Sequence, residues 1–291
     1  MGKELTIILG PTGVGKTDYS IQLAKEYDSP IINCDSRQIF KELKIGTAPP
    51  SVEQLAAVKH YFIFSHSVQE LYTAGKYELE ALALLEELFK THNKLVMVGG
   101  SGMYIDALCN GLDDFPQADQ ELRSNLMERL EHEGLESMRT QLKLIDRESY
   151  DGIDIANPHR VIRAIEVTLQ TGRKFSDWKS SPKKARPFEI KKIGLNRNRE
   201  DLYERINRRV DVMIETGLLQ EVQSLAAYRN MPALNTVGYK ELFNYLDGTI
   251  SLEIAVDLIK RNSRRYAKRQ LTYWGRDKNI EWLSCPAQIK I

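Results

Sequence analysis

Residues Leu5–Thr17 read LTIILGPTGVGKT, an apolar run followed by a full match to the phosphate-loop pattern G-x-x-x-x-G-K-[ST]. The run predicts a buried strand and the segment Asp18 to Tyr27 predicts a helix, which is the context that this motif requires. Glycines leave backbone N–H groups free to surround an anion, Lys16 adds a positive charge, and the Thr17 hydroxyl can bind Mg²⁺. The sequence therefore predicts a site for a di- or triphosphate. The residues of this site are Gly10, Pro11, Thr12, Gly13, Val14, Gly15, Lys16 and Thr17.

The composition is that of a globular protein. The chain has 291 residues, of which 42% are hydrophobic and 28% are charged, with a net charge of +1. No window approaches the roughly 18 consecutive apolar residues of a membrane span, and the N-terminus enters a strand without a signal-peptide pattern, so we expect a cytoplasmic protein. The three cysteines are scattered, which disfavours a disulfide framework and a zinc site. Without a coiled-coil pattern or a long exposed apolar stripe, we expect a monomer.

Short apolar runs alternate with helical patterns along much of the chain. The expected strands are Leu5–Gly10, Pro30–Cys34, Tyr61–Phe64, Leu95–Val98 and Ile190–Leu195, and the helices near them are Asp18–Tyr27, Tyr77–Thr91 and Met103–Gly111. In the second of these helices, one apolar stripe is expected, formed by Leu79, Leu82, Leu85, Leu88 and Phe89. The alternation predicts an α/β fold with a parallel sheet of the P-loop NTPase type, flanked by helices, with ligands at the carboxyl ends of the strands.

The pattern changes between Pro116 and about Pro187. Charged amphipathic helices are expected at 119–132, 135–145 and 157–171, where the α/β pattern is interrupted. We therefore predict a helical insertion domain at 116–185 within a catalytic core formed by 1–115 and 186–291. The C-terminal region is again helical, with Asp201–Glu215 and Leu252–Trp274 as the clearest helices.

Polar and glycine-rich segments follow two of the expected strands. Asp35 is placed where a carboxylate can bind Mg²⁺ or abstract a proton, but a turn or helix cap explains its position equally well. The strand Leu95–Val98 continues into Gly99-Gly100-Ser101-Gly102, without the acid that a typical P-loop NTPase has there. The missing acid favours a site in which the phosphate is a leaving group, with Ser101 as a hydroxyl donor.

A strongly basic stretch lies near the C-terminus. No acidic residue occurs between Asp257 and Asp277, whereas the stretch contains Lys260, Arg261, Arg264, Arg265, Lys268, Arg269 and Arg276. Interleaved aromatic residues favour phosphate contacts combined with base stacking, and the alternative is a solvated helix whose counter-charges come from other segments. Arg160 and Arg163 lie one helical turn apart and could clamp a phosphate, although a solvated pair is commoner. The histidines show no metal-ligand spacing.

With GPTGVGKT, DSRQIF, GTAPPS, VGGSGMYIDAL, NPHRVIRAIEV, NTVGYKEL and KRQLTYWGR in this order, the chain resembles the bacterial tRNA dimethylallyltransferases, also called tRNA isopentenyltransferases or IPP transferases. The resemblance implies transfer of a dimethylallyl group from dimethylallyl diphosphate to N6 of adenosine 37, 3′ of the anticodon, in tRNAs that read UNN codons. Diphosphate is released. It also implies that Asp35 is the general base, that Lys16, Thr17 and Mg²⁺ act on the diphosphate, and that Ser101 lies near the reacting centre.

The same resemblance assigns contacts with tRNA. They are Asp35, Ser36, Arg37, Gln38, Ser101, Arg123, His159, Arg160, Val161, Ile162, Arg163, Asn235, Thr236, Val237, Gly238, Tyr239, Lys240, Lys268, Arg269, Gln270, Leu271, Thr272, Tyr273, Trp274 and Gly275. Where the family commonly has His-His-Leu-Ile-Asp, this chain reads His60-Tyr61-Phe62-Ile63-Phe64. The alternative functions are an ATP-dependent small-molecule kinase and a nucleic-acid-binding NTPase switch.

Overall fold

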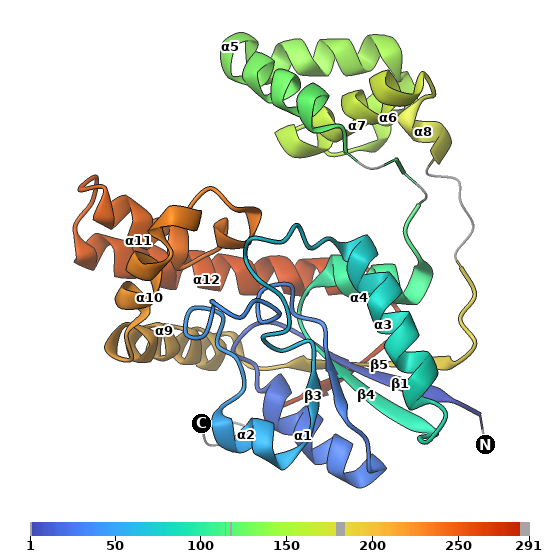
Figure 1. Ribbon diagram of the computed structural model, residues 1–291, viewed down its shortest axis with the longest axis vertical. Coiled ribbons are helices and arrows are strands. Elements are labelled where there is room, and N and C mark those ends of the chain that lie inside the picture. The colour runs from blue at the N-terminus through green and yellow to red at the C-terminus, as the bar shows by residue number, and fades with distance from the viewer. Residues whose placement is uncertain (1, 114, 117, 179–183, 286–291) are drawn as a thin grey trace. The chain divides into compact units, whose positions relative to one another are not determined.

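The computed structural model describes residues 2–113, 115–116, 118–178 and 184–285. The chain divides into two compact units (Figure 1), of which the first comprises Met1–Cys109 with Arg186–Ile291 and the second comprises Asn110–Ala185. Each unit has its own buried apolar cluster. The second unit is therefore inserted in the chain of the first.

The first unit is built on a parallel sheet. Its strands are β1 (Glu4–Leu9), β2 (Ile31–Asn33), β3 (His60–Tyr61), β4 (Lys94–Val98), β5 (Glu189–Asn196) and β6 (Ile280–Ser284). Within the described residues they form one six-stranded sheet in the order β3-β2-β4-β1-β5-β6, with every pair parallel. The central β1 is buried from Leu5 to Leu9 because both of its edges are paired and helices cover the sheet. This arrangement confirms the predicted α/β fold.

Helices alternate with the first strands of the sheet, and a further group of helices lies between β5 and β6 in the sequence. They are α1 (Lys16–Tyr27), α2 (Val52–Ala57), α3 (Ala74–Leu88), α4 (Gly102–Asn110), α9 (Arg199–Glu215), α10 (Leu218–Ser224), α11 (Tyr239–Leu246) and α12 (Leu252–Trp274). The long helix α12 packs against both α9 and α11, as Figure 1 shows. These packed helices bring the C-terminal basic stretch alongside the sheet.

The structure corrects three local expectations. The strand expected at Tyr61–Phe64 ends at Tyr61, because Phe62 and Phe64 adopt left-handed backbone angles, with φ of 60° and 51°. The edge strand β6 was not predicted, since exposed residues interrupt its short apolar pattern. In α3, Leu79 is 72% exposed while Glu78 is buried, where its carboxylate forms a 2.7 Å ion pair with Arg186.

The second unit is helical. It contains α5 (Gln120–Ile145), α6 (Arg147–Gly152), α7 (Pro158–Thr171) and α8 (Phe175–Trp178). Helix α5 is broken at Gly134, whose φ is 79°, so its two arms correspond to the helices expected at 119–132 and 135–145. Apolar side chains of α5 and α7, including Met138, Leu142 and Ile165, form the core of this unit.

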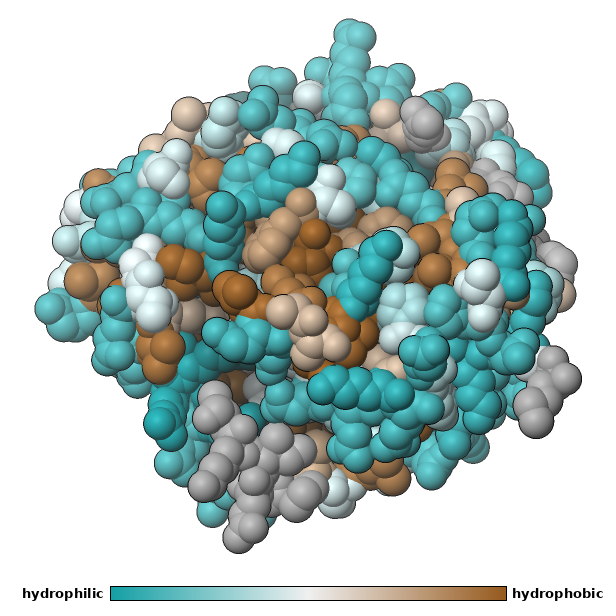
Figure 2. Space-filling model, turned by 60° about the horizontal axis from the view of Figure 1, so that its bottom comes forward, coloured by the Kyte–Doolittle hydropathy of each residue, from teal (hydrophilic) through white to brown (hydrophobic). Residues whose placement is uncertain are grey.

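On the face shown in Figure 2, hydrophobic side chains lie in patches bordered by hydrophilic ones. Among the residues that the structure describes, no helix is both long enough and apolar enough to span a membrane.

Candidate active site

The phosphate loop connects β1 to α1 at the carboxyl end of the sheet. Gly10, Gly13 and Gly15 have φ of 143°, 83° and 108°, which L side chains rarely adopt. A Cβ at Gly10 would also lie 2.5 Å from the carbonyl oxygen of Leu195 in β5. Helix α1 begins at Lys16, so the positive end of its dipole lies where the loop borders a cavity, an arrangement suited to an anion.

This first cavity has a volume of about 360 Å³ and is lined by the phosphate loop on one side. Nζ of Lys16 donates to the carbonyl oxygens of Gly10 at 3.0 Å and Pro11 at 2.9 Å. Burial lowers the pKa of Lys16 to about 8, although the nearby Asp35 opposes this shift. The lysine is therefore still mainly charged at pH 7 and can turn from its own loop to a bound diphosphate.

Helix α9 contributes three arginines, Arg205, Arg208 and Arg209, to the same cavity. Nε of Arg205 donates to the carbonyl oxygen of Gly13 at 2.9 Å, and Nη2 of Arg209 donates to Oγ1 of Thr12 at 2.7 Å. Nε of Arg209 is buried without a hydrogen-bond partner, so it is a donor that an anion can satisfy. Burial lowers the pKa of Arg209 to about 10, which still leaves it charged at neutral pH. Sequence reasoning missed these arginines, although their i, i+3, i+4 spacing in an expected helix was a usable signal.

Asp35 caps a turn and also lines the cavities of the site. Its Oδ1 accepts hydrogen bonds from the backbone N–H groups of Arg37 at 2.8 Å and Gln38 at 3.3 Å, so it caps the turn after β2. The same residue lines the first cavity and also a second one. A carboxylate in this position can accept a proton from a substrate while its turn stays fixed.

The second cavity, of about 510 Å³, adjoins the first. Both are lined by Thr12, Asp35, Thr47, Ala48, Arg209 and Tyr266. The remainder of the second lining includes the segment Asn235–Gly238 with Lys240, and the cations Arg265 and Arg269 of α12. Burial, with a smaller contribution from Asp35, raises the pKa of Tyr266 to about 12, so its hydroxyl stays protonated. Asp35 and Arg209 therefore line both the cavity bordered by the phosphate loop and the cationic one.

Ser101 lies beside Asp35 but lines neither cavity. Its Oγ accepts a hydrogen bond from the N–H of Ser36 at 2.9 Å and donates to Oγ of Ser36 at 3.1 Å. The predicted reacting-centre hydroxyl is therefore used to join the turn after β4 to the turn that contains Asp35.

The segment Thr47–Pro50 forms one rim of the first cavity. Nε2 of Gln38 donates to the carbonyl oxygens of Thr47 at 3.1 Å and Ala48 at 2.9 Å, so its amide nitrogen is already engaged within the protein. Glu221 of α10, which no motif singled out, accepts hydrogen bonds from the backbone N–H groups of residues 44–46. These contacts fix the rim.

Several residues assigned to RNA contact have buried side chains. They are Ser101, Val161, Ile162, Tyr239, Gln270 and Trp274. Asn235, Lys240, Lys268 and Arg269 are exposed.

Part of the basic stretch on α12 is engaged by other segments of the chain. Lys260 forms an ion pair with Asp211 at 2.5 Å, and Arg264 donates a hydrogen bond to Asn207 at 2.6 Å. Two of its exposed cations, Arg265 and Arg269, border the second cavity.

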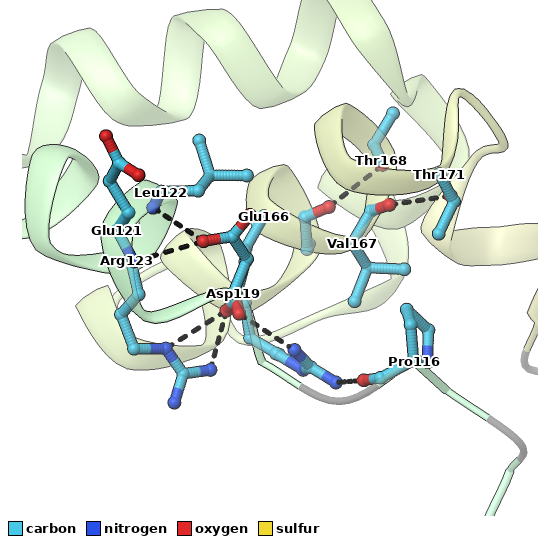
Figure 3. A network of polar contacts seen from close by, with 11 residues as sticks. Pro116, Asp119, Glu121, Leu122, Arg123, Glu166, Val167, Thr168 and Thr171 are labelled. Atoms are coloured by element: carbon cyan, nitrogen blue, oxygen red, sulfur yellow. Dashed lines mark hydrogen bonds and ion pairs between the residues drawn. The ribbon is translucent and has the colours of Figure 1, made fainter.

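In the second unit, Arg123 and Arg163 share one buried carboxylate, that of Glu166, whose contact with Arg123 is seen in Figure 3. Arg123 donates to Glu166 Oε2 through Nη2 at 2.6 Å and Nε at 3.1 Å, while Nη1 of Arg163 donates to Oε1 at 3.1 Å. Nη2 of Arg163 also donates to the carbonyl oxygen of Pro116 at 2.8 Å. Arg160 is exposed and lies 3.8 Å from Asp154. Glu166 and Pro116 therefore already engage Arg163, whereas Arg160 stays exposed, and a phosphate clamp formed by the two arginines stays a prediction.

No group of three or more His, Cys, Asp or Glu side chains suited to a metal ion occurs among the described residues. His60 lines the first cavity with Nδ1 2.8 Å from the carbonyl oxygen of Val58, and His66 lies 3.4 Å from Glu80. Thr17 also lines this cavity. The protein therefore offers a hydroxyl near the phosphate loop rather than a complete metal cage.

Comparison with known proteins accounts for this arrangement. The sequence model of a family described as IPP transferase matches residues 38–277. The chain belongs to the IPP transferase family. It is 47% identical over 291 residues to tRNA dimethylallyltransferase 1 of Phocaeicola vulgatus, covering 100% of this chain and 97% of that protein. A similar enzyme of Porphyromonas gingivalis, tRNA dimethylallyltransferase 2, is 50% identical over 278 residues, with 96% and 93% coverage.

Solved structures agree with this IPP transferase assignment. A full-length tRNA isopentenylpyrophosphate transferase from Bacillus halodurans superposes with a TM-score of 0.71 at 36% identity, covering 97% of this chain and 90% of that one. A eukaryotic dimethylallyltransferase, described as acting on tRNA, superposes with a TM-score of 0.80 at 27% identity, covering 97% of this chain and 74% of the eukaryotic chain. The parallel sheet with its phosphate loop is thus the fold of an IPP transferase.

Proposed function

We propose that this IPP transferase moves the dimethylallyl group of dimethylallyl diphosphate to N6 of adenosine 37 in tRNAs that read UNN codons, with release of diphosphate. The observation that carries the proposal is the pair of adjoining cavities that share Asp35 and Arg209. One cavity has the groups that bind a diphosphate, and the other has the exposed cations that bind an RNA backbone. The names of the relatives support the same reaction.

The donor diphosphate binds in the first cavity. Lys16, the arginines of α9 and the start of α1 all place positive charge or N–H donors there. Because these groups are partly removed from water, their attraction for an anion exceeds that of exposed cations. They also stabilise the negative charge that develops on diphosphate as the C–O bond to the prenyl group breaks.

The residues present fit a bound Mg²⁺. This ion commonly takes one or two protein oxygens, substrate phosphates and water, rather than a cage made only of protein. We expect the Thr17 hydroxyl to hold it, because Thr17 lines the first cavity and no group of three or more His, Cys, Asp or Glu side chains suited to a metal occurs among the described residues. When bound, Mg²⁺ would neutralise part of the diphosphate charge.

The acceptor adenine enters from the second cavity. Its N6 amine is a poor nucleophile because the lone pair is delocalised into the ring, so removal of its proton is needed as the C–N bond forms. Asp35 lies between the cavities and accepts this proton. Exposing a base from a single-stranded anticodon loop costs a few kcal/mol at most, which phosphate contacts with Arg265 and Arg269 can offset. We place the protein in the cytoplasm, where tRNA is, and expect it to act as a monomer.

The test is mass analysis of purified tRNA after incubation with the protein, Mg²⁺ and dimethylallyl diphosphate. We expect a mass gain equal to one dimethylallyl group in place of one hydrogen, located at adenosine 37 by nuclease digestion. A matched incubation with ATP in place of the donor should leave the tRNA unchanged. ATP turnover without RNA, combined with no prenylated tRNA, would contradict the proposal and favour the kinase or the NTPase-switch alternative.

A further inference from the structure

Gln270 connects three parts of the active site that are distant in sequence. It lies on α12 with its side chain only 6% exposed. Its Oε1 accepts a hydrogen bond from the backbone N–H of Thr12 at 2.8 Å, and its Nε2 donates to the carbonyl oxygen of Gly100 at 2.9 Å. A single amide therefore joins the basic helix to the phosphate loop and to the glycine turn after β4.

Both of its partners occupy critical positions. Thr12 borders the two cavities, and its hydroxyl accepts the hydrogen bond from Arg209, so this residue is held from α9 and from α12. Gly100 precedes Ser101, whose hydroxyl bonds to Ser36 next to Asp35. The Gln270 side chain lies so close to the backbone of Gly100 that a Cβ added at Gly100 would be 2.3 Å from Nε2 of Gln270. The position of Gln270 thus affects the phosphate loop directly and the Asp35 turn through the glycine turn.

We propose that Gln270 is a positioning residue that keeps the phosphate loop aligned with the turn containing Asp35. It does not touch RNA, although the sequence groups it with the exposed Lys268 and Arg269. The proposal rests on the proposed function in one respect, namely that Asp35 as the base and the donor diphosphate as the leaving group act in the same reaction on the two sides of this junction. The loss of either hydrogen bond frees one side of the junction and leaves a buried polar group of the backbone without its partner.

The first experiment compares Gln270→Met with a control of the same chemistry at an exposed site, Gln223→Met on α10. Methionine has a similar length but forms neither hydrogen bond. We expect Gln270→Met to weaken binding of Mg²⁺-pyrophosphate, measured by calorimetry, and to lower kcat for prenyl transfer, each by about tenfold. Its affinity for tRNA should stay within about twofold of the parent, and Gln223→Met should match the parent throughout.

Gln270→Glu provides a second test that separates positioning from general stability. A protonated carboxyl group can accept from Thr12 N–H and donate to the carbonyl oxygen of Gly100, as the amide does, whereas an ionised one cannot donate. Burial raises the pKa of such a carboxyl group. Activity relative to the parent should therefore rise for Gln270→Glu as the pH is lowered from about 8 to about 6, and the same ratio should stay flat for Gln270→Met.

The outcomes are distinguishable. If Gln270→Met keeps pyrophosphate affinity and kcat within about twofold of the parent, the positioning role is wrong. It is also wrong if tRNA affinity falls tenfold while pyrophosphate affinity is unchanged, because Gln270 would then be an RNA contact. If Gln270→Met does not fold, the test is the activity of Gln270→Glu relative to the parent as a function of pH. A relative activity that does not change with pH overturns the proposal. A parent protein that binds pyrophosphate but prenylates no tRNA refutes the proposed function alone, since pyrophosphate affinity still tests Gln270.

Discussion

Replacing Asp35 with asparagine should separate its two roles. The Oδ1 of an asparagine side chain can accept the same hydrogen bonds from the N–H groups of Arg37 and Gln38, so the turn after β2 should survive. The side chain can no longer take a proton from the acceptor amine. We therefore expect kcat to fall by about 10²-fold or more, the usual scale for loss of a general base, while stability hardly changes.

Asp35→Ala supplies the matched comparison. It loses the base and also both hydrogen bonds, of which the 3.3 Å one is long and weaker. At about 1 kcal/mol for a good hydrogen bond, the loss totals about 1.5 kcal/mol. For a unit of this size, this lowers Tm by about 4 °C. Asp35→Asn and Asp35→Ala should then have the same kcat, and Asp35→Ala should have the lower Tm.

The assay is prenyl transfer to tRNA at saturating donor, with tRNA affinity and thermal unfolding measured on the same preparations. The Asp35→Asn substitution removes a negative charge near the diphosphate, so donor affinity should stay equal or improve. A fall in donor affinity would indicate that Asp35 binds the metal instead. If Asp35→Asn turns over within about threefold of the parent, Asp35 is not the base.

Other predictions concern charge. Burial lowers the pKa of Lys16 to about 8, and only the charged lysine attracts diphosphate. The value of kcat/KM for the donor should therefore fall as the pH rises above about 8. A kcat/KM that stays level up to a pH of about 9.5 would refute this role of Lys16. Replacing both Arg265 and Arg269 with glutamine should reduce the slope of log K for tRNA against log[salt] by about 1.5. The control Lys25→Gln, at an exposed position on α1, should leave this slope unchanged. If the double variant also leaves the slope unchanged, these two arginines of α12 do not contact the tRNA backbone. Glu166→Gln should destabilise the second unit by about 2 kcal/mol, less than for a fully buried pair because both arginines are partly exposed. Faster hydrogen exchange in α5 and α7 would support this, and parental rates would contradict it.

Much of the fold could be predicted from local patterns. The run ending at Leu9 is buried on a central strand, and the helices of the insertion follow their apolar periodicity, including a break at Gly134. The errors arose where tertiary contacts override such patterns. Glu78 is buried because Arg186 neutralises it, and Phe62 takes a left-handed conformation that its residue type does not signal.

The sequence by itself determined the phosphate loop, the parallel α/β fold and the family, because these depend on residue order and on spacing along the chain. Only the tertiary structure decided which side chain meets which partner. It brought Arg209 and Gln270 to Thr12 from helices 197 and 258 residues further along the chain, and it turned Gln270 inward beside two exposed cations. The physical reason is that a helical period tells which residues share a face, whereas long-range packing determines what that face contacts.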